Sequence, residues 1–513
     1  MPGRNINLRS KNSIRNVTAA VTCQIINTIL SFLCRYIFIQ LLSETYLGLS
    51  GLFSDVLYIL SVAELGIGTA ITFSMYKPLA QHNRKEIGAL MSLYRRTYHI
   101  IGAIVSAVGL GLIPFIPGIT HNPPVKYLIL IYLMYVFNTV ITYFFSYWQT
   151  IINADQKAYI CTIYQYGFSI AQNIIQVLVL FLTRNFILYL LIQIICNFLM
   201  NLTLAFKAKK MYPYVIKYGK EKLDASVRSE IVKNIKAMFL HRIGGAVVNG
   251  TDNILISTFF GLSNVAINFN YNLIINTLSN IITQIFNSIT ASVGNLGAVE
   301  TDRRSYQVYK SVNFAGFWIY SFCSISLFCL LNPFILLWTR KSMLFPLLTV
   351  LLIVLNFYTF GMRQTTLMFK NAFGLFWYDR YKAVFEAAVN LAASLILAHF
   401  IGVSGIFLGT LISTMTVDFW VEPLVLFRHG FHHSVAPYFK RYIIYAMLTA
   451  INGLITWYCC SRVGGQGLLS FIAKCFICAV IPNLFYLVIF YRTKEFQYFK
   501  NIIKLPALFK PRS

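Results

Sequence analysis

The chain has 513 residues, of which 57% are hydrophobic and 12% are charged, and its mean hydropathy is +0.65. This composition excludes an ordinary soluble domain. The net charge of +27 does not require a nucleic-acid partner, because most basic residues lie in short segments between apolar stretches, where they would face anionic lipid.

Fourteen apolar stretches are about long enough for a helix to cross the hydrocarbon core of a bilayer. They predict an all-α polytopic membrane protein with about 14 transmembrane helices. The first stretch is too long for a removable signal peptide, so we expect it to be retained. In chain order, the predicted spans are 16–42, 54–76, 97–117, 127–152, 159–182, 186–206, 237–260, 268–293, 312–338, 346–369, 384–401, 404–427, 442–461 and 468–491.

The basic residues between these stretches fall in alternate gaps. One set of gaps contains 34 Lys and Arg residues, and the complementary set contains only five. The positive-inside rule therefore predicts a multi-pass protein of the bacterial cytoplasmic (inner) membrane with both termini in the cytoplasm.

A basic, polar segment at 207–236 divides the first twelve spans into two sets of six. The sequence ADQKAY at 154–159 follows span four, and YDRYKAV at 378–384 follows span ten, which suggests a repeat. Parallel repeats of this kind occur in transporters whose substrate site lies between the repeats. We expect an N-lobe at 1–206, a cytoplasmic linker at 207–236, a C-lobe at 237–430, and helices 13 and 14 with a cytoplasmic tail at 431–513.

Four basic residues lie inside predicted spans, where a charge is costly and often functional. Arg35, Arg242 and Arg363 are candidates for a cationic cavity, since guanidinium groups bind phosphate oxygens bidentately. The alternative for each is that the side chain extends to the headgroup layer. We expect the fourth residue, Lys474, to do the latter.

Acidic residues inside spans are candidates for coupling to H⁺ or Na⁺. Glu64 and Asp252 lie near the middle of their spans, and Glu386 is nearer an interface. Asp418 and Glu422 are four residues apart and therefore share one face of a helix. The alternative for Glu64 and Asp252 is an interhelical hydrogen bond, and the alternative for Asp418 and Glu422 is that their helix turns this face to a neighbouring helix.

The sequence indicates no metal site and no cofactor. Cys475 and Cys478 have CxxC spacing, but without a second pair or nearby His ligands we expect them to serve packing. No GxxxxGK[ST], HExxH or GxSxG motif is present, so the chain carries no ATPase motif and neither of these hydrolase motifs.

Several segments resemble Wzx-type polysaccharide flippases of the multidrug/oligosaccharidyl-lipid/polysaccharide exporter superfamily. They are YLGLSGLFSDVLYILSVAELGIGTAITFSMYKPLA at 46–80, LMSLYRRTYHIIG at 90–102, ADQKAYI at 154–160, GTDNILIS at 250–257 and GLFWYDRYKAV at 374–384. The resemblance implies a two-lobed flippase for an oligosaccharide linked to undecaprenyl pyrophosphate. It also implies alternating access and a cationic central cavity, to which Arg35, Arg242 and Arg363 are the nearest matches.

Our leading hypothesis is therefore a flippase for surface polysaccharide (exopolysaccharide) biosynthesis. Its substrate would be a lipid-linked oligosaccharide in the bilayer. Its protein partners would be a polysaccharide polymerase and export machinery. Two alternatives stay open: a cation-coupled multidrug antiporter of the same superfamily, and a membrane glycan polymerase or glycosyltransferase. The short outer loops argue against the enzyme, because such enzymes usually need a large external region.

Overall fold

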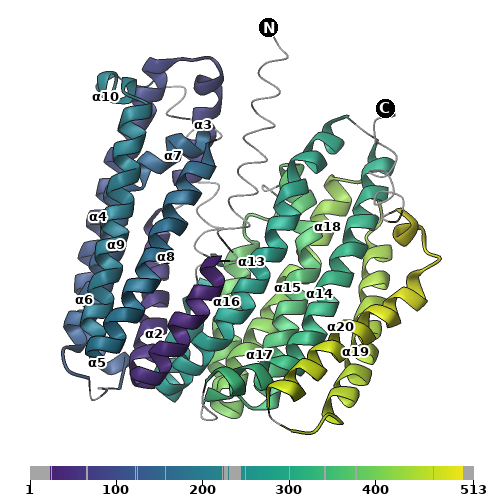
Figure 1. Cartoon of the computed structure of the whole chain (residues 1–513). Helices are drawn as coiled ribbons and strands as arrows, with labels where there is room; N and C mark the ends of the chain where they lie inside the picture. The colour runs from purple at the N-terminus through teal and green to yellow at the C-terminus, as the bar shows by residue number, and fades with distance from the viewer. Residues whose placement is uncertain are drawn as a thin grey trace, which may run out of the picture. The chain divides into compact units, whose positions relative to one another are not determined.

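The structure is a computed structural model in which every described element of secondary structure is a helix (Figure 1). Apart from single residues, it describes residues 26–64, 67–121, 125–155, 157–221, 250–299, 301–339, 343–375, 378–465 and 467–498. The prediction of an all-α protein is confirmed.

The chain divides into two compact units, which we call unit 1 (Met1–Ala266) and unit 2 (Ile267–Ser513). The division falls inside one helix, α13. The predicted lobe boundaries, with a linker at 207–236, remain a prediction, because residues 231–243 and most of 222–230 lie outside the described part of the chain.

Unit 1 is built around four long helices, of which α6 packs against α4 and α9, and α8 packs against α9. An unlabelled helix, Ile26–Leu41, precedes them. The others are α2 (Glu44–Leu60), η1 (Ser61–Glu64), α3 (Ile67–Ala80), α4 (Arg84–Gly111), η2 (Ile113–Phe115), α5 (Ile116–Ile119), α6 (Leu128–Phe145), α7 (Tyr147–Ala154), α8 (Ala158–Thr183), α9 (Phe186–Met211), α10 (Tyr214–Lys217) and α12 (Asp252–Phe260).

Unit 2 is organised around α14, which packs against α15, α19 and α20. The two C-terminal helices that the sequence predicts as an addition are thus attached to the core of this unit. Its elements are α13 (Leu262–Val299), α14 (Asp302–Trp338), α15 (Leu347–Ala372), α16 (Lys382–Ile401), α17 (Val403–Ser413), the π-helical turn η5 (Thr414–Asp418), α18 (Phe419–His429), α19 (Ala436–Ser461) and α20 (Leu468–Phe490).

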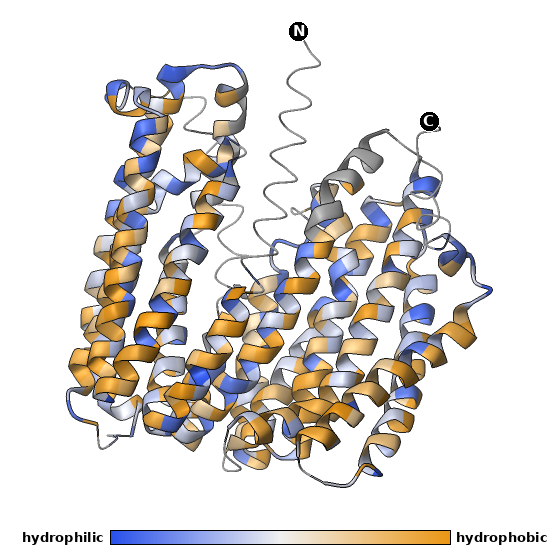
Figure 2. Cartoon of the chain, in the orientation of Figure 1, coloured by the Kyte–Doolittle hydropathy of each residue, from blue (hydrophilic) through white to orange (hydrophobic). Residues whose placement is uncertain are grey.

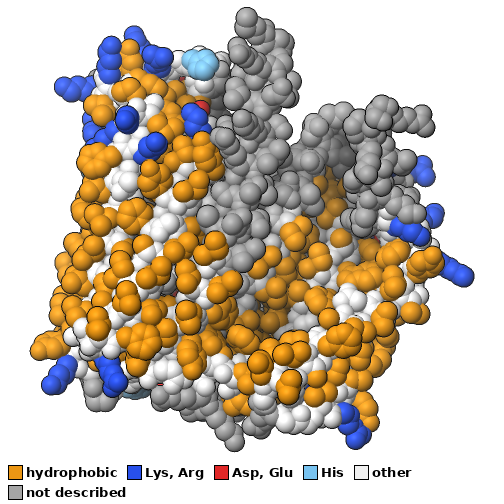
Figure 3. Space-filling view, in the orientation of Figure 1, with side chains coloured by type: hydrophobic (Ala, Val, Ile, Leu, Met, Phe, Trp, Pro, Cys, Tyr) orange, Lys and Arg blue, Asp and Glu red, His pale blue; other side chains and the backbone are white. Residues whose placement is uncertain are grey.

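Ten helical segments in the described part of the chain are long and apolar enough to cross a membrane. Figure 2 shows that apolar residues dominate the helices, and Figure 3 shows hydrophobic side chains covering their sides while Lys and Arg lie toward their ends. Leu182, Leu469 and Val488 are 80–85% exposed, a degree of exposure typical of lipid-facing side chains. The chain is a multi-pass membrane protein.

Several predicted spans are interrupted within the described part of the chain, among them three that contribute to the sites below. The span at 54–76 is divided by η1 and begins earlier, at Glu44, because polar residues such as the buried Ser50 lower the hydropathy of α2 without preventing its burial. The span at 127–152 breaks at Ser146 between α6 and α7. The span at 404–427 contains η5, and Pro423 removes one backbone donor from the helix that follows.

Three segments from the basic set of gaps meet at one end of unit 1. Gly88 lies against Tyr218, and the Arg84 guanidinium lies 5.7 Å from the centre of the Tyr214 ring. The Tyr212 hydroxyl donates to Asp155 over 2.8 Å. Burial and the neighbouring Asp155 raise the pKa of the Tyr212 phenol above its ordinary value, so the phenol remains a donor. This meeting is what the charge count predicts for segments on one side of a membrane.

The two repeated sequences occupy similar positions. Asp155 stands three residues before the start of α8, and Asp379 stands three residues before the start of α16. Asp155 pairs with Lys157 over 2.6 Å, and Asp379 pairs with Lys370. The first pair is about one-third exposed, whereas the second is buried.

Candidate functional site

Unit 1 contains a cavity of about 430 Å³ whose lining residues all carry a polar group. All twelve lining residues bear a hydroxyl, amide or carboxylate group, and they come from η1, α4, α6, α7, α9 and the α6–α7 junction. We call this the polar cavity. Its lining residues are Glu64, Tyr94, Tyr98, Asn138, Thr139, Thr142, Tyr143, Ser146, Gln149, Thr150, Asn153 and Asn197.

A chain of five side-chain amides runs along this region and joins four helices. Gln165 donates to Gln149 over 3.0 Å, and Gln149 donates to Asn201 over 3.0 Å. Asn201 donates to Asn197 over 2.9 Å, and Asn197 donates to Asn138 over 2.8 Å. Each amide carries both donors and acceptors, so the chain holds its members in fixed orientations and leaves further positions for a ligand.

Glu64 is the one acid in the lining of the polar cavity, and it is held by two tyrosines. The Tyr98 hydroxyl donates to the Glu64 carboxylate, and the Tyr94 hydroxyl donates to Tyr98 over 3.0 Å. Thr150 donates in turn to Tyr94 over 3.1 Å. The end of the 3₁₀ turn η1 positions Glu64 here. The Glu64 carboxylate is thus hydrogen-bonded between helices, as in the alternative to ion coupling that the sequence left open.

A second cavity, of about 290 Å³, continues this polar region toward α8. It shares Asn138 and Asn197 with the polar cavity and adds Gln165, Ser169 and Gln172. Asn and Gln did not stand out in the sequence, because a neutral amide does not interrupt a hydropathy profile as a charge does. The signal that could have found them was their regular recurrence in spans four to six.

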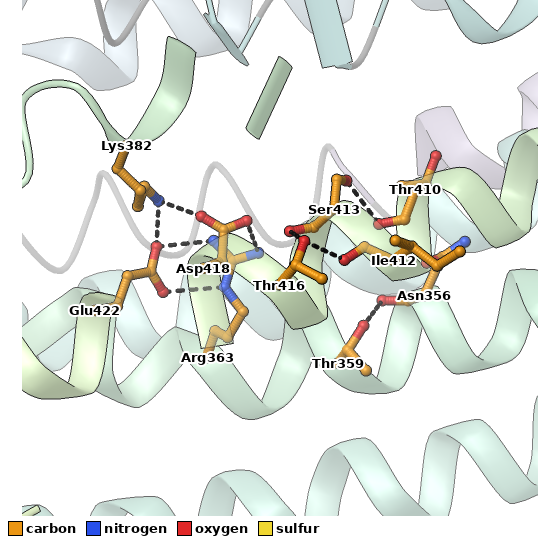
Figure 4. A network of polar contacts seen from close by, with 10 residues as sticks. All are labelled: Asn356, Thr359, Arg363, Lys382, Thr410, Ile412, Ser413, Thr416, Asp418 and Glu422. Carbon is orange, nitrogen blue, oxygen red and sulfur yellow. Dashed lines mark hydrogen bonds and ion pairs between the residues drawn. The ribbon is translucent and has the colours of Figure 1, made fainter. Parts of the chain in front are cut away.

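Unit 2 contains a different arrangement, which we call the charge cluster: Arg363, Lys382, Asp418 and Glu422 (Figure 4). Arg363 on α15 donates to both Glu422 carboxylate oxygens, from Nε over 3.0 Å and from Nη2 over 2.8 Å. Its Nη1 lies 3.0 Å from Asp418. Lys382 Nζ lies 2.7 Å from Asp418 and 2.5 Å from Glu422. Each carboxylate therefore contacts both cations.

The cluster is buried and nearly neutral. Both carboxylate side chains are completely buried, and those of Arg363 and Lys382 are 11% and 8% exposed. The π-helical turn ends at Asp418, and Glu422 follows one turn later on α18, so both point toward α15 and α16. Glu386, one turn after Lys382 on α16, interacts electrostatically with Asp418. π-Turns are frequent at functional sites.

Sequence analysis singled out Arg363 and, apart from it, the pair Asp418 and Glu422, and the structure brings all three together. It missed Lys382, which the charge count placed in a cytoplasmic gap. The available signal was the position of Lys382 one turn before Glu386 at the start of an apolar span. Arg363 forms interhelical ion pairs, because its guanidinium contacts the carboxylates of Asp418 and Glu422.

Of the other cations inside predicted spans, Arg35 and Lys474 are not part of either site. Arg35 lies on the helix Ile26–Leu41, is half-buried, and interacts electrostatically with Tyr189 and Tyr135. Arg242 lies outside the described residues. Lys474 is half-buried on α20.

Asp252 lies at the start of α12 and is close enough to Asp55 on α2 to interact electrostatically. Asn253 donates to Asp55 over 2.8 Å. Within the described part of the chain, Asp252 Oδ1 is buried and has no hydrogen-bond partner. Sequence analysis missed Asp55, which stands at the edge of the second predicted span.

No family model matches the sequence, and no curated protein matches it. Solved structures do. The lipid II flippase MurJ in an inward closed conformation is 12% identical, covers 92% of this chain and 98% of its own, and gives a TM-score of 0.65. An inward-facing multidrug resistance MATE family transporter of the MOP superfamily is 11% identical, over 80% and 97% of the two chains, with a TM-score of 0.61.

A mutant of the Vibrio cholerae MATE transporter VcmN is 13% identical, covers 83% of this chain and 99% of its own, and has a TM-score of 0.59. At these identities the likeness bears on the fold alone. The chain has the fold shared by the MurJ lipid II flippase and by MATE transporters of the MOP superfamily.

Proposed function

We propose that this protein is a flippase that moves a lipid-linked oligosaccharide across the bacterial cytoplasmic membrane by alternating access. The observation that carries this proposal is the polar cavity, in which all twelve lining residues can hydrogen-bond. Drug-sized ligands usually occupy predominantly apolar pockets with few polar groups. A lining in which every residue carries a polar group favours a ligand rich in hydroxyl groups.

The chemistry of the lining suits sugars. A sugar hydroxyl both donates and accepts hydrogen bonds, and amide and hydroxyl side chains do the same. The amide chain through Gln149 and Asn197 holds these groups in place before a ligand arrives, which lowers the entropic cost of binding. Three tyrosines in the lining, Tyr94, Tyr98 and Tyr143, add ring surfaces beside the hydroxyl groups.

The lipid-linked part of the substrate is a separate proposal. The resemblance to Wzx-type flippases suggests undecaprenyl pyrophosphate, with Arg35, Arg242 and Arg363 as candidate ligands. At Arg363 a phosphate would have to displace Glu422, because that carboxylate already occupies the bidentate face of the guanidinium. Arg35 and Arg242 are therefore the better candidates for mutagenesis.

The membrane orientation also belongs to the proposal. Cytoplasmic termini follow from the charge count, and the meeting of three basic segments at one end of unit 1 supports it. The two-lobe repeat is supported by the equivalent placement of Asp155 and Asp379 before α8 and α16.

A cation-coupled multidrug antiporter is the second candidate, because MATE transporters share the fold. Glu64 would be its coupling residue in unit 1, with Asp252, Asp418 and Glu422 as further candidates. Glu64 favours this candidate because its carboxylate sits at the head of a chain of hydroxyl groups, Tyr98, Tyr94 and Thr150, suited to moving a proton.

Reconstitution distinguishes the two candidates. Purified full-length protein is placed in vesicles with a lipid-linked oligosaccharide that carries a fluorescent label on its sugar, and quenching from outside reports transbilayer movement. We expect movement that depends on the protein and falls roughly tenfold in Asn197→Leu, since one or two ligand hydrogen bonds are lost. Thr203→Val, on the same helix but outside the polar cavity, serves as the matched control.

Absence of movement by the wild-type protein would overturn the flippase. Protein-dependent drug efflux driven by an imposed cation gradient in the same vesicles would instead establish the antiporter.

A further inference from the structure

Three cysteines from three helices of unit 2 meet in its interior. They are Cys329 on α14, Cys460 on α19 and Cys478 on α20, and all three are buried. Their sulfur atoms lie within 4.8 Å of one another, the separation expected of ligands to one metal ion. We call this the thiol cluster.

The CxxC spacing did not reveal this cluster. Cys478 belongs to it, whereas Cys475, three residues earlier on α20, interacts electrostatically with Cys460 but is not one of the three grouped thiols. The partners of Cys478 come instead from positions far away in the sequence. Cys459 likewise lies next to Cys460 and stays outside the cluster. Cys459 and Cys475 are thus built-in controls.

The separation of the sulfur atoms is compatible with coordination. Cys460 Sγ and Cys478 Sγ are 3.8 Å apart. Metal–thiolate bonds of about 2.3 Å place neighbouring sulfur ligands roughly 3.8–4.0 Å apart in tetrahedral or trigonal geometry. Ions could therefore enter without a large movement of these helices.

The electrostatic surroundings also suit thiolates. Lys474 stands one helical turn before Cys478 and interacts electrostatically with Cys460 and Cys329. Cys460 Sγ lies 4.0 Å from the Lys474 carbonyl oxygen. A positive charge beside buried sulfur atoms offsets part of the negative charge that they acquire as ligands. This gives Lys474 a role within the protein, beyond the headgroup contact that its sequence position suggested.

We propose that Cys329, Cys460 and Cys478 form a trigonal thiolate site for one soft, monovalent metal ion, Cu(I). Thiolates select soft ions such as Cu(I), whereas a structural zinc ion takes four ligands. The described residues supply three grouped His, Cys, Asp or Glu ligands here and no fourth. A bound ion would link α19 and α20 to α14, the central helix of unit 2.

The test uses reduced, full-length protein in detergent, titrated anaerobically with Cu(I) against a chromogenic Cu(I) chelator. We expect one equivalent of bound copper and an X-ray absorption spectrum of three sulfur ligands. Cys329→Ser, Cys460→Ser and Cys478→Ser should each abolish tight binding. Cys459→Ser and Cys475→Ser should retain it. Size-exclusion elution identifies any variant that has lost its fold.

Several results would overturn the proposal. One is that the wild-type protein binds no copper after complete reduction. The same holds if the protein is isolated with a Cys460–Cys478 disulfide and still binds no copper once that disulfide has been reduced. Equal loss of copper in Cys475→Ser would show that the thiol cluster is not the site. Stoichiometric zinc binding without copper binding would overturn the choice of ion. If all three Ser variants fail to fold, the X-ray absorption spectrum of the copper-loaded wild-type protein decides. A spectrum without three sulfur ligands would overturn the proposal.

Discussion

The polar cavity of unit 1 and the charge cluster of unit 2 differ in how they satisfy polar side chains between membrane helices. Both place hydrogen-bonding side chains inside helices that must also be apolar. The cavity uses neutral amides and hydroxyls with a single acid, whereas the cluster pairs two cations with two carboxylates. Ions buried together satisfy one another and are costly to separate. Amides exchange partners at lower cost, so the cavity is the better place for a ligand that must be bound and released.

The largest effect should come from breaking the charge cluster. Arg363→Leu leaves Lys382 to balance two buried carboxylates, and we expect about 3–5 kcal/mol of lost stability. Thermal unfolding in detergent and the amount of protein in membranes measure this. The double variant Arg363→Leu with Glu422→Leu leaves one Lys382–Asp418 pair and should recover much of the loss. A double variant less stable than the single one would contradict mutual compensation.

A smaller loss should follow from interrupting the amide chain. Gln149→Leu removes the partner of Asn201 and of Gln165, and a buried amide without its partner costs about 1–3 kcal/mol. The same unfolding measurement checks it, with Thr203→Val as the control. A loss as large as that of Arg363→Leu would show that the cavity is as tightly constrained as the cluster, and the comparison between them would fail.

Removing the charge of Glu64 should matter less still for a flippase that recognises sugars. Glu64→Gln keeps an oxygen that can accept from Tyr98, so we expect transport of the lipid-linked oligosaccharide to change by less than about threefold. Transport is measured in vesicles with and without a proton or sodium gradient. If Glu64→Gln loses both transport and its dependence on the gradient, the antiporter is favoured instead.

The smallest loss of stability should come from breaking the Lys157–Asp155 ion pair, which is the more exposed of the two pairs in the repeated sequences. Lys157→Ala breaks a pair whose side chains are 36% and 31% exposed, and such pairs contribute about 0–1 kcal/mol. Unfolding at low and high salt measures the loss, which should nearly vanish in high salt. A loss of several kcal/mol would mean that the segment before α8 is as tightly coupled as the buried pair at Asp379.

Hydropathy and charge counting predicted the helical class and most spans, because crossing a bilayer imposes a length and composition on each segment. They could not predict the breaks at η1 and η5, since these depend on where Glu64 and Asp418 find partners in the folded protein. Arg363 was visible as an isolated charge, and Asp418 and Glu422 as a pair on one helix face. Their pairing, and the inclusion of Lys382, depends on which of the helices α15, α16 and α18 lie next to one another.

The candidate binding site was the part that sequence predicted least. Charges in spans drew attention to Arg35 and Arg363, whereas the groups that line the polar cavity are mostly neutral. Asn138, Gln149 and Asn197 come from α6, α7 and α9, which lie within two spans that hydropathy predicts as membrane-crossing. Only the packing of α6, α7 and α9 reveals that they face a common space.

The most direct test of sugar recognition compares transbilayer movement of the lipid-linked oligosaccharide with that of the same carrier lipid without sugars. We expect wild-type protein to prefer the glycosylated lipid, and we expect Asn197→Leu to lose most of that preference while still moving the bare carrier. An unchanged preference in Asn197→Leu, in protein that elutes as a folded species, would contradict the assignment of the polar cavity as the sugar site.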